Sequence, residues 1–507
     1  MKIVLVQGRL RGDRSSDNLE NVKNTLQRRE ADSPALIVFP ALILSGRLGP
    51  AALARPGLDR QYEKVWSDFL ALSAKHPKTA LASTRLVFQA DGRIEEEAFL
   101  VRGGKIIFRQ PLPVDGRVEL FKLDGQTLAL WPGRSEAPAA ARKAADIFIS
   151  FRNQLFEGQP YFPPPGEAGD GWRINVSAVG GEGPYIYDGA TWVFDPKGRL
   201  KGWLDGFSGA MIILDSKSDR LPTLEPLPRR EPPAVLHEAL VAGLHDYVRS
   251  AGSGQVLLGL SGGLDSAVVA VLAVDALGAD NVLGVAMPSE YNSPESLSLA
   301  RDLAKNLKIS FLTVPIDGIR ESFTRSFLLT PKRSEKDGHL ADENIQARIR
   351  AVLLMYLANR EDRLLLATGN KSEAAMGYST LYGDTCGAVA PIGDVYKSRL
   401  YELARHLNKD GERIPEGIIS RPPSAELRPG QKDEDSLPPY AILDDILERH
   451  LEGRQSGSQV AKSGGHSAIT VAWVLGALKK TAFKRAQEPF SLVASVSPLA
   501  GLDWAKP

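Results

Sequence analysis

The stretch that decides the fold is GLSGGLDSA, residues 259–267, which stands between the apolar runs VLL and VVAVLAV. This pattern predicts a strand, a tight glycine-rich turn and a helix. The backbone N–H groups of such a turn and of the helix start attract an anion. We therefore expect a phosphate-binding loop formed by Gly259, Leu260, Ser261, Gly262, Gly263, Leu264, Asp265 and Ser266.

Asp265 is the unusual member of this loop, because a carboxylate repels a phosphate unless a divalent cation lies between them. Magnesium prefers carboxylate and phosphate oxygens and is the natural bridge. The common loop G-x-x-x-x-G-K-[ST] has a lysine for the β- and γ-phosphates, and that lysine is missing here. Transfer of the γ-phosphate is therefore the weaker interpretation. The structural alternative is a turn whose glycines only ease packing.

Strands and helices alternate around this loop. Strands are predicted at 255–260, 281–289, 310–316 and 363–369, and helices at 235–252, 264–278, 293–307 and 341–361. This alternation predicts a doubly wound parallel sheet, in which ligands bind outside the carboxyl ends of the strands. Those ends read GLSGG, AMPSE (with Met287), PID and TGNKSE, so we expect the site at this edge.

The first part of the chain is also mixed α/β. Residues 16–32 have the pattern of an amphipathic helix, and residues 184–196 and 201–215 that of antiparallel strands joined by DG, PKG and DG turns. Further strands are predicted at 2–7, 35–40, 79–84, 97–102, 105–110, 127–132 and 146–150. The proline-rich stretch 214–235 cannot hold a helix or a central strand and is the expected linker. We expect two domains, at 1–225 and 226–507.

The bulk composition excludes several classes of protein. The 507 residues carry a formal net charge of +1, so the chain lacks the basic excess of a nucleic-acid-binding protein. The sequence has no continuous stretch of about 18 apolar residues, so it predicts no membrane span. The single cysteine, Cys386, excludes a disulfide within the chain and a multi-cysteine metal site. We expect a soluble, cytoplasmic protein without nucleic-acid or membrane partners.

The pattern S-G-G-x-D-S resembles the pyrophosphate loop of the N-type ATP pyrophosphatases. The stretches NIQARIR (344–350), LATGNKSEAAMGYSTLYGD (366–384), DVYKSRLYELA (394–404) and RPPSAELRPGQKDEDSLPPY (421–440) resemble NAD synthetase. The resemblance implies a ligase that forms a C–N bond. ATP would adenylate the carboxylate of deamido-NAD, and ammonia would displace AMP, giving NAD, AMP and pyrophosphate.

The resemblance also implies roles at the ATP site. Asp265 and Glu373 resemble the family's magnesium-binding carboxylates, and Thr368 resembles a threonine that contacts ATP. Lys397 resembles the lysine that reaches the phosphates, and Ser424 resembles a hydroxyl on the loop that covers ATP. We expect Asp265, Glu373 and Lys397 to carry the chemistry. Taken alone, a lysine such as Lys397 is typical of a surface charge.

A second group resembles residues that bind deamido-NAD. Asn344 and Arg348 are four residues apart and therefore share one helix face. Lys484, near the C-terminus, resembles a basic residue that closes over the dinucleotide, and Glu373 also belongs to this site. Some ammonia-using members carry a lysine where this chain has Leu381, and the leucine is typical of the glutamine-dependent branch.

The first part resembles the nitrilase-like glutaminase domain that is fused to many NAD synthetases, in MKIVLVQ, ALIVFPALILSG and VGGEGPYIYDGATWVFDPKGRL. This implies an αββα sandwich whose active members use a glutamate, a lysine and a cysteine nucleophile. At the matching positions this chain has Ala41, Arg109 and Trp131. None of the three can replace its counterpart. We predict a catalytically inactive glutaminase domain and the use of free ammonia.

Other interpretations stay open from the sequence. The enzyme could receive ammonia from a partner glutaminase, or the chain could be a regulatory pseudoenzyme. Other synthetases with the same ATP chemistry share S-G-G-x-D-S, but GNKSE and the stretch 421–440 favour NAD synthetase. The resemblance also implies a homodimer or a higher homo-oligomer.

Overall fold

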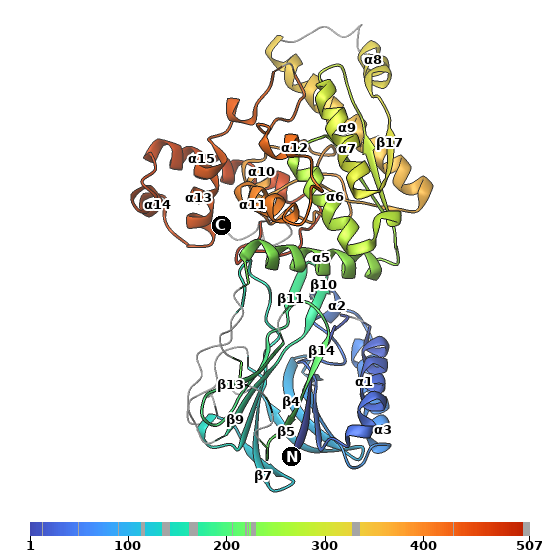
Figure 1. Cartoon of the computed structure of the whole chain (residues 1–507), viewed down its shortest axis with the longest axis vertical. Coiled ribbons are helices and arrows are strands. Elements are labelled where there is room, and N and C mark those ends of the chain that lie inside the picture. Colours follow the sequence, from blue (N-terminus) through green and yellow to red (C-terminus); the bar gives the residue numbers. More distant parts are fainter. Residues whose placement is uncertain are drawn as a thin grey trace. The chain divides into compact units, whose positions relative to one another are not determined.

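The computed structural model describes residues 1–12, 14–48, 50–89, 91–112, 117–133, 142–161, 171–204, 206–218, 221, 223–224, 230–326, 335–428 and 430–499. The chain divides into two compact units (Figure 1). Met1–Phe156 and Pro160–Arg230 form the first unit, and Glu157–Gln159 and Glu231–Pro507 form the second. The division falls inside the proline-rich stretch 214–235.

Two six-stranded sheets make up most of the first unit, in the orders β14-β1-β2-β3-β4-β5 and β13-β12-β9-β8-β7-β6. In each sheet the three parallel strands, β1 to β3 and β7 to β9, have antiparallel neighbours. The first sheet contains β1 (Lys2–Gln7), β2 (Leu36–Val38), β3 (Ala80–Phe88), β4 (Ile94–Arg102), β5 (Lys105–Pro111) and β14 (Ala210–Asp215). The second contains β6 (Leu120–Leu123), β7 (Gln126–Trp131), β8 (Ile147–Phe151), β9 (Trp172–Val176), β12 (Thr191–Phe194) and β13 (Leu200–Leu204).

Alternation along the strands builds two cores from one sheet. In β1, Ile3 and Leu5 belong to the core between the two sheets, whereas Val4 and Val6 face the helices outside the first sheet. Those helices are α1 (Ser15–Arg29) and α3 (Leu58–Ala74), seen together in Figure 1, with the short α2 (Pro50–Leu53) and the 3₁₀ turn η1 (Glu30–Asp32). The sequence analysis did not identify α3, although Tyr62, Trp66, Phe69 and Ser73 recur at helical spacing and are buried.

The turn signals of residues 184–215 were only partly interpreted correctly. The PKG turn joins β12 and β13 as a hairpin. The first DG turn does not, because β11 (Tyr185–Asp188) pairs with β10 (Val179–Glu182), while β12 pairs with β9. The second DG precedes β14, which leaves the sheet of β13 and pairs with β1. Turn chemistry is local, whereas the strand partner is chosen by tertiary packing.

The second unit contains the predicted parallel sheet, in the order β17-β16-β15-β18. Its strands are β15 (Val256–Gly259), β16 (Val282–Ala286), β17 (Ser310–Thr313) and β18 (Leu364–Leu365). Because β15 lies between β16 and β18, the strand order reverses at β15, and the crevice for a ligand opens at such a switch point. The predicted mixed α/β class is confirmed, with a sandwich of two sheets in the first unit and a parallel sheet in the second.

Helices pack on this sheet and beside it. α6 packs on β15 and β16, and α9 contributes Ile349, Leu357 and Ala358 to the core under Leu257 and Val285. The helices are α5 (Pro232–Ser250), α6 (Leu264–Leu277), α7 (Pro294–Leu307), α8 (Asp317–Arg325), α9 (Glu335–Glu361), α10 (Lys371–Met376), α11 (Lys397–Leu407), α12 (Glu416–Ser420), α13 (Tyr440–Leu451), α14 (Gly457–Gly464), α15 (Ala468–Lys480) and α16 (Ala482–Arg485). Two 3₁₀ turns, η2 (Ala279–Asn281) and η3 (Asp433–Asp435), complete the set.

One prediction about the linker was wrong, because α5 begins at Pro232, inside the stretch expected to hold no helix. Proline is tolerated in a first helical turn, where the missing N–H has no intrahelical partner.

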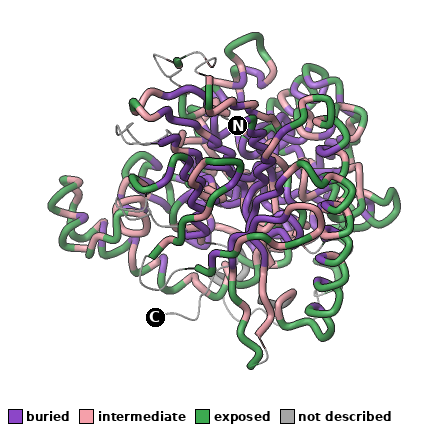
Figure 2. The backbone as a smooth tube through the Cα atoms, turned by 90° about the horizontal axis from the view of Figure 1, so that it is seen from below, coloured by how far each residue is buried: buried purple, intermediate pink, exposed green. Residues whose placement is uncertain are grey.

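Figure 2 shows buried backbone in the interior and exposed backbone at the periphery. Among the described residues, no helix combines the length and the apolar character needed to cross a membrane.

Candidate active site

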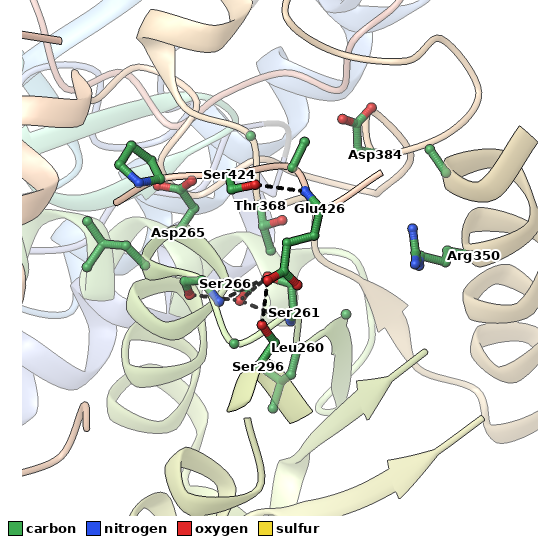
Figure 3. A pocket seen from close by; sticks show the side chains of 18 of the residues that line it. Leu260, Ser261, Asp265, Ser266, Ser296, Arg350, Thr368, Asp384, Ser424 and Glu426 are labelled. Atoms are coloured by element: carbon green, nitrogen blue, oxygen red, sulfur yellow. Dashed lines mark hydrogen bonds between the residues drawn. The ribbon is translucent and has the colours of Figure 1, made fainter. Parts of the chain in front are cut away.

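A cavity of about 310 Å³ opens at the carboxyl ends of β15, β16 and β18, at the switch point of the sheet (Figure 3). The twelve residues predicted to bind ATP all line this cavity. They are Gly259, Leu260, Ser261, Gly262, Gly263, Leu264, Asp265, Ser266, Met287, Thr368, Lys397 and Ser424. The structure therefore brings segments more than 150 positions apart to one cavity.

The glycine-rich loop needs glycine at its centre. Gly262 has a φ of +79°, and a Cβ atom there would overlap the main-chain carbonyl of Ser296. The hydroxyl oxygens of Ser261 and Ser266 lie 3.2 Å apart, and the Gly263 N–H donates to the Ser261 hydroxyl over 3.2 Å. No side chain caps the start of α6. Its first N–H groups and the two hydroxyls therefore form a set of donors suited to an anion.

An ion cluster lies beside this loop. The Lys397 ammonium is 2.5 Å from Oδ2 of Asp265 and 3.5 Å from Oε1 of Glu373. Burial alone would lower the pKa of Lys397, but the charges of Asp265 and Glu373 outweigh burial and raise it. Burial, together with the charge of Asp265, raises the pKa of Glu373. The cluster is thus two carboxylates that share one buried cation.

Helix starts hold these side chains in place. Glu373 lies in the first turn of α10, where the Asn370 side chain accepts the Glu373 N–H over 3.0 Å and caps the helix. Lys397 is the first residue of α11, and Asp265 lies in the first turn of α6. Three helices therefore begin around the same cavity and present their functional side chains from fixed backbone positions.

The donor set fits a magnesium ion that would also bind phosphate oxygens. Oδ1 of Asp265 is buried and accepts no hydrogen bond from protein. Among the described residues, no group of three or more His, Cys, Asp or Glu side chains could enclose a metal ion. A site with two protein carboxylates suits magnesium, which usually keeps waters and takes ligands from a bound phosphate.

The residues predicted to bind deamido-NAD, apart from Glu373, do not line this cavity. They contact the neighbouring segment 377–381 instead. The Thr380 hydroxyl donates to Oδ1 of Asn344 over 2.7 Å, and Nε of Arg348 donates to the Leu381 carbonyl over 3.1 Å. The Lys484 ammonium donates to the Gly377 and Ser379 carbonyls over 2.7 and 2.6 Å. Asn344, Arg348 and Lys484 therefore surround one segment, just beyond Glu373.

The sequence analysis missed two residues on another face of α9. Gln346 donates from Nε2 to the Leu427 carbonyl over 3.1 Å, and Arg350 donates from Nε to the Met287 carbonyl over 3.0 Å. Burial lowers the pKa of Arg350 to about 10. Gln346 and Arg350 are four positions apart, as are Asn344 and Arg348, so this spacing in NIQARIR was the available signal.

The loop 421–428 was also underestimated. Glu426 has a φ of +47°, which is unusual for a residue with a side chain. Its carboxylate accepts a hydrogen bond from the Ser296 hydroxyl over 2.8 Å (Figure 3). It also accepts one from Nδ2 of Asn292 over 2.9 Å and pairs with Arg421. The Ser424 hydroxyl accepts the Glu426 N–H over 3.1 Å. These contacts fix the loop across the cavity.

Two further acids and the cysteine line the cavity. Burial raises the pKa of Asp384 to about 6, although the Thr380 N–H donates to its carboxylate. Asp433 accepts a hydrogen bond from the Tyr440 hydroxyl over 2.9 Å. Burial, followed by the charge of Asp384, raises the pKa of Cys386, which is half-buried. A raised pKa disfavours the thiolate, so this environment does not activate a nucleophile.

The three glutaminase positions lie in different surroundings in the first unit. Ala41 is buried in the core between the sheets. Trp131 packs with Ala129, Ala145 and Phe148 in a separate cluster. Arg109 is exposed on β5, where its register partner is Phe99.

The second unit contains a region that matches a known protein family. Residues 236–488 match the sequence model of a family described as NAD synthase. A glutamine-dependent NAD(+) synthetase from Synechocystis sp. is 43% identical over 318 residues, 62% of this chain and 56% of that protein. The corresponding synthetase from Aquifex aeolicus is 40% identical over 367 residues, 66% of this chain and 64% of that protein. The matched region therefore spans less than two thirds of these relatives.

Solved structures extend the similarity to the whole chain. A glutamine-dependent NAD+ synthetase from Acinetobacter baumannii, solved in complex with ADP, superposes with a TM-score of 0.73 and 26% identity over 99% of both chains. A glutamine-dependent NAD(+) synthetase from Cytophaga hutchinsonii gives a TM-score of 0.81 over 100% of this chain and 97% of that one. Its 18% identity supports the fold alone.

Proposed function

Because this chain belongs to the glutamine-dependent NAD synthetase family, we propose that it makes NAD from deamido-NAD, with ATP as co-substrate. The observation that carries this proposal is the cluster of Asp265, Lys397 and Glu373 beside the glycine-rich loop. A loop of donors next to a buried lysine suits a reaction in which negative charge develops on a leaving pyrophosphate.

In the first step, a carboxylate oxygen of deamido-NAD attacks the α-phosphorus of ATP. The new O–P bond forms as the bond between the α-phosphorus and the bridging oxygen breaks, and pyrophosphate leaves with that electron pair. The N–H groups of the loop and the hydroxyls of Ser261 and Ser266 bind the β- and γ-phosphates. Lys397, which lines the same cavity, stabilises the negative charge that develops on the leaving group.

Asp265 and Glu373 would hold a magnesium ion, which when bound neutralises part of the triphosphate charge. The residues around segment 377–381 bind the dinucleotide and direct its carboxylate toward Glu373. Asn344 and Lys484 supply a hydrogen-bonding side chain and a positive charge on two sides of that segment. Binding both substrates at adjoining places brings the reacting oxygen and phosphorus together.

In the second step, ammonia attacks the carbonyl carbon of the adenylate. The C–N bond forms, the C–O bond to AMP breaks, and AMP leaves with its electron pair. The products are NAD, AMP and pyrophosphate, and a proton is released from the attacking ammonia.

Incubation of the full chain with ATP, magnesium chloride, deamido-NAD and ammonium chloride tests this assignment. NAD, AMP and pyrophosphate should appear in equal amounts, and AMP should not form when deamido-NAD is omitted. Formation of ADP and phosphate, or the absence of NAD with all components present, would contradict the proposal.

We further propose that the first unit does not hydrolyse glutamine by thiol chemistry, in contrast to what the names of the relatives say of those proteins. The chain has one cysteine, Cys386, and it belongs to the second unit. Alanine at 41 cannot accept a proton, and tryptophan at 131 is no nucleophile. The nitrogen source is then free ammonia or ammonia from a separate protein. Glutamate release from glutamine, measured without deamido-NAD, should stay at the level of the buffer control.

The proposed enzyme is a homodimer or a higher homo-oligomer. α9 exposes Val352, Met355 and Tyr356, which lie three and four positions apart on one face. An exposed apolar face of this kind favours burial against a second copy. Light scattering after gel filtration should give at least twice the chain mass, and Val352→Asp should lower it. A monomer for the unsubstituted chain would contradict this part.

A further inference from the structure

The two helices that carry Glu373 and Lys397 begin side by side. The Lys371 N–H donates to the Val395 carbonyl over 3.0 Å, so the residue that opens α10 is bonded to the residue two positions before α11. Glu373 and Lys397 lie in the first turns of these helices. Their separation therefore depends on how the two helix starts are held.

α11 has no cap of its own, because the side chain of Tyr396, its N-cap residue, accepts no hydrogen bond from the first turn. Partners from elsewhere replace that cap. The Lys397 N–H donates to the Ser372 hydroxyl over 2.9 Å, and the Ser398 N–H donates to Oδ2 of Asp444 over 2.8 Å. The Ser372 hydroxyl in turn donates to Oδ1 of Asp444 over 2.5 Å. One carboxylate thus binds both helix starts.

Asp444 comes from α13 and is 3% exposed. It does not line the cavity, so it is not placed to touch a substrate. Its charge is favourable at a helix start, where the N–H groups carry partial positive charge. We infer that Asp444 is a positioning residue for the synthetase reaction, which clamps the starts of α10 and α11 and so sets the distance between Glu373 and Lys397.

This inference rests on the proposed function, because its effect is read through NAD formation. Removal of the carboxylate charge leaves one of the two donors without an acceptor, since the amide oxygen of asparagine can satisfy only one of the two positions. The start of α11 then loses a hydrogen bond that holds it in place, and Lys397, its first residue, shifts with it. A reacting geometry misplaced by about 1 Å can cost about a hundredfold in rate.

The experiment is steady-state NAD formation with ammonium by the full chain and its Asp444→Asn variant. We expect kcat to fall at least about tenfold, with the KM for ATP within about threefold, because the lost contribution belongs to the transition state. Asp445→Asn is the matched control. Asp445 is the next residue of α13, its side chain is 37% exposed, and it pairs with Arg449 and His466 away from the cavity. Its kcat should stay within about twofold of the unsubstituted chain.

A double-mutant cycle separates positioning from a general loss of structure. In a Lys397→Met background, Asp444→Asn should lower kcat less than about twofold further, because its target is already removed. An equal loss in both backgrounds would show that Asp444 does not act through Lys397. Ser372→Ala tests the same contact in a second way, because it removes the hydroxyl between Asp444 and the Lys397 N–H while the Asp444 carboxylate stays. Its kcat should also fall, and a normal kcat in both Asp444→Asn and Ser372→Ala would overturn the inference.

The two proposals fail in different ways. If the unsubstituted chain makes no NAD, the proposed function is contradicted, and the role of Asp444 falls with it. If the unsubstituted chain is active and Asp444→Asn equals it, only the role of Asp444 is overturned. Circular dichroism of each variant establishes that the rates compare folded proteins.

Discussion

The ammonium of Lys397 donates to Oδ2 of Asp265 over 2.5 Å, although the two residues are 132 positions apart. The contact joins the start of α11 to the start of α6, and Glu373 completes it from α10. In the chain without substrate, the buried ammonium lies between the carboxyl groups of Asp265 and Glu373. If a triphosphate binds, the Lys397 ammonium can pair with a phosphate in place of Asp265 or Glu373. Such an exchange suits the proposed interaction of this lysine with a leaving group.

Lys397→Met should therefore abolish most of the synthetase activity. We expect kcat to fall by about 10²–10³, the range for loss of one preorganised group that stabilises transition-state charge. Lys397→Arg should recover little of this, because the guanidinium is larger than the compact ammonium that it would replace in this buried site. Initial rates of AMP formation measure both variants. A loss smaller than about threefold in Lys397→Met would remove Lys397 from the chemistry.

The centre of the glycine-rich loop should not tolerate a side chain. Gly262→Ala places a Cβ against the Ser296 carbonyl at a φ of +79°, so the loop must shift. We expect NAD formation to fall about a hundredfold. Gly278→Ala is the matched control at the other end of α6, because Gly278 has a φ of +86° with open space around its Cβ position. Both variants should lose stability, but only Gly262→Ala should lose kcat. Equal rates in the two variants would contradict this role of the loop.

The two faces of α9 should separate the two substrates. Gln346 contacts the loop 421–428, whereas Asn344 contacts segment 377–381. Gln346→Ala should raise the KM for ATP about tenfold, and Asn344→Ala should do the same for deamido-NAD, as expected for one lost hydrogen bond in a buried site. Each variant should leave the other KM within about threefold. The test is a pair of substrate titrations, and a crossed or uniform pattern would show that α9 does not divide the sites in this way.

A pH effect on the first unit follows from Glu182. Burial raises the pKa of its carboxyl from 4.5 to about 7, against the Arg47 N–H and the Tyr187 hydroxyl that donate to it. The folded state holds this proton more tightly than the unfolded state. The stability from Glu182 is therefore present below pH 4.5 and is lost as the pH rises through about 7.

Glu182→Gln removes this titration while keeping an acceptor for the Arg47 N–H. We expect the thermal midpoint of the unsubstituted chain to fall more between pH 5 and pH 8 than that of Glu182→Gln. Tryptophan fluorescence can follow the transition, because Trp66 and Trp172 belong to the same unit as Glu182. Parallel pH profiles for the two proteins would show that the carboxyl titrates normally.

Much of the cavity could be predicted from the sequence, since its residues follow strands of a parallel sheet. The rule that ligands bind at the carboxyl ends places Gly259, Met287 and Thr368 at one edge of the sheet from the sequence alone. The same rule gives no information about residues from other elements. Glu426 reaches the cavity from a loop, and Asp444 acts from α13, so their positions depend on tertiary packing.

The first unit shows the same limit. Residues 2–7 could be assigned to a strand from the sequence. The DG turn at Asp188 and Gly189 predicted the wrong strand partner, because the strand that ends at Asp188 pairs with β10 and not with β12. A turn dipeptide fixes the local backbone angles, but the hydrogen-bonding partner of the next strand lies elsewhere in the chain.

The central claim is that an intact synthetase site stands in one polypeptide with a glutaminase unit that lacks its thiol. The most direct test is the initial rate of NAD formation by the purified chain with ammonium chloride or with ammonia-free glutamine as the sole nitrogen source. We predict sustained NAD formation with ammonium and a rate with glutamine no greater than that without a nitrogen source. A glutamine-supported rate equal to the ammonium-supported rate would contradict the claim.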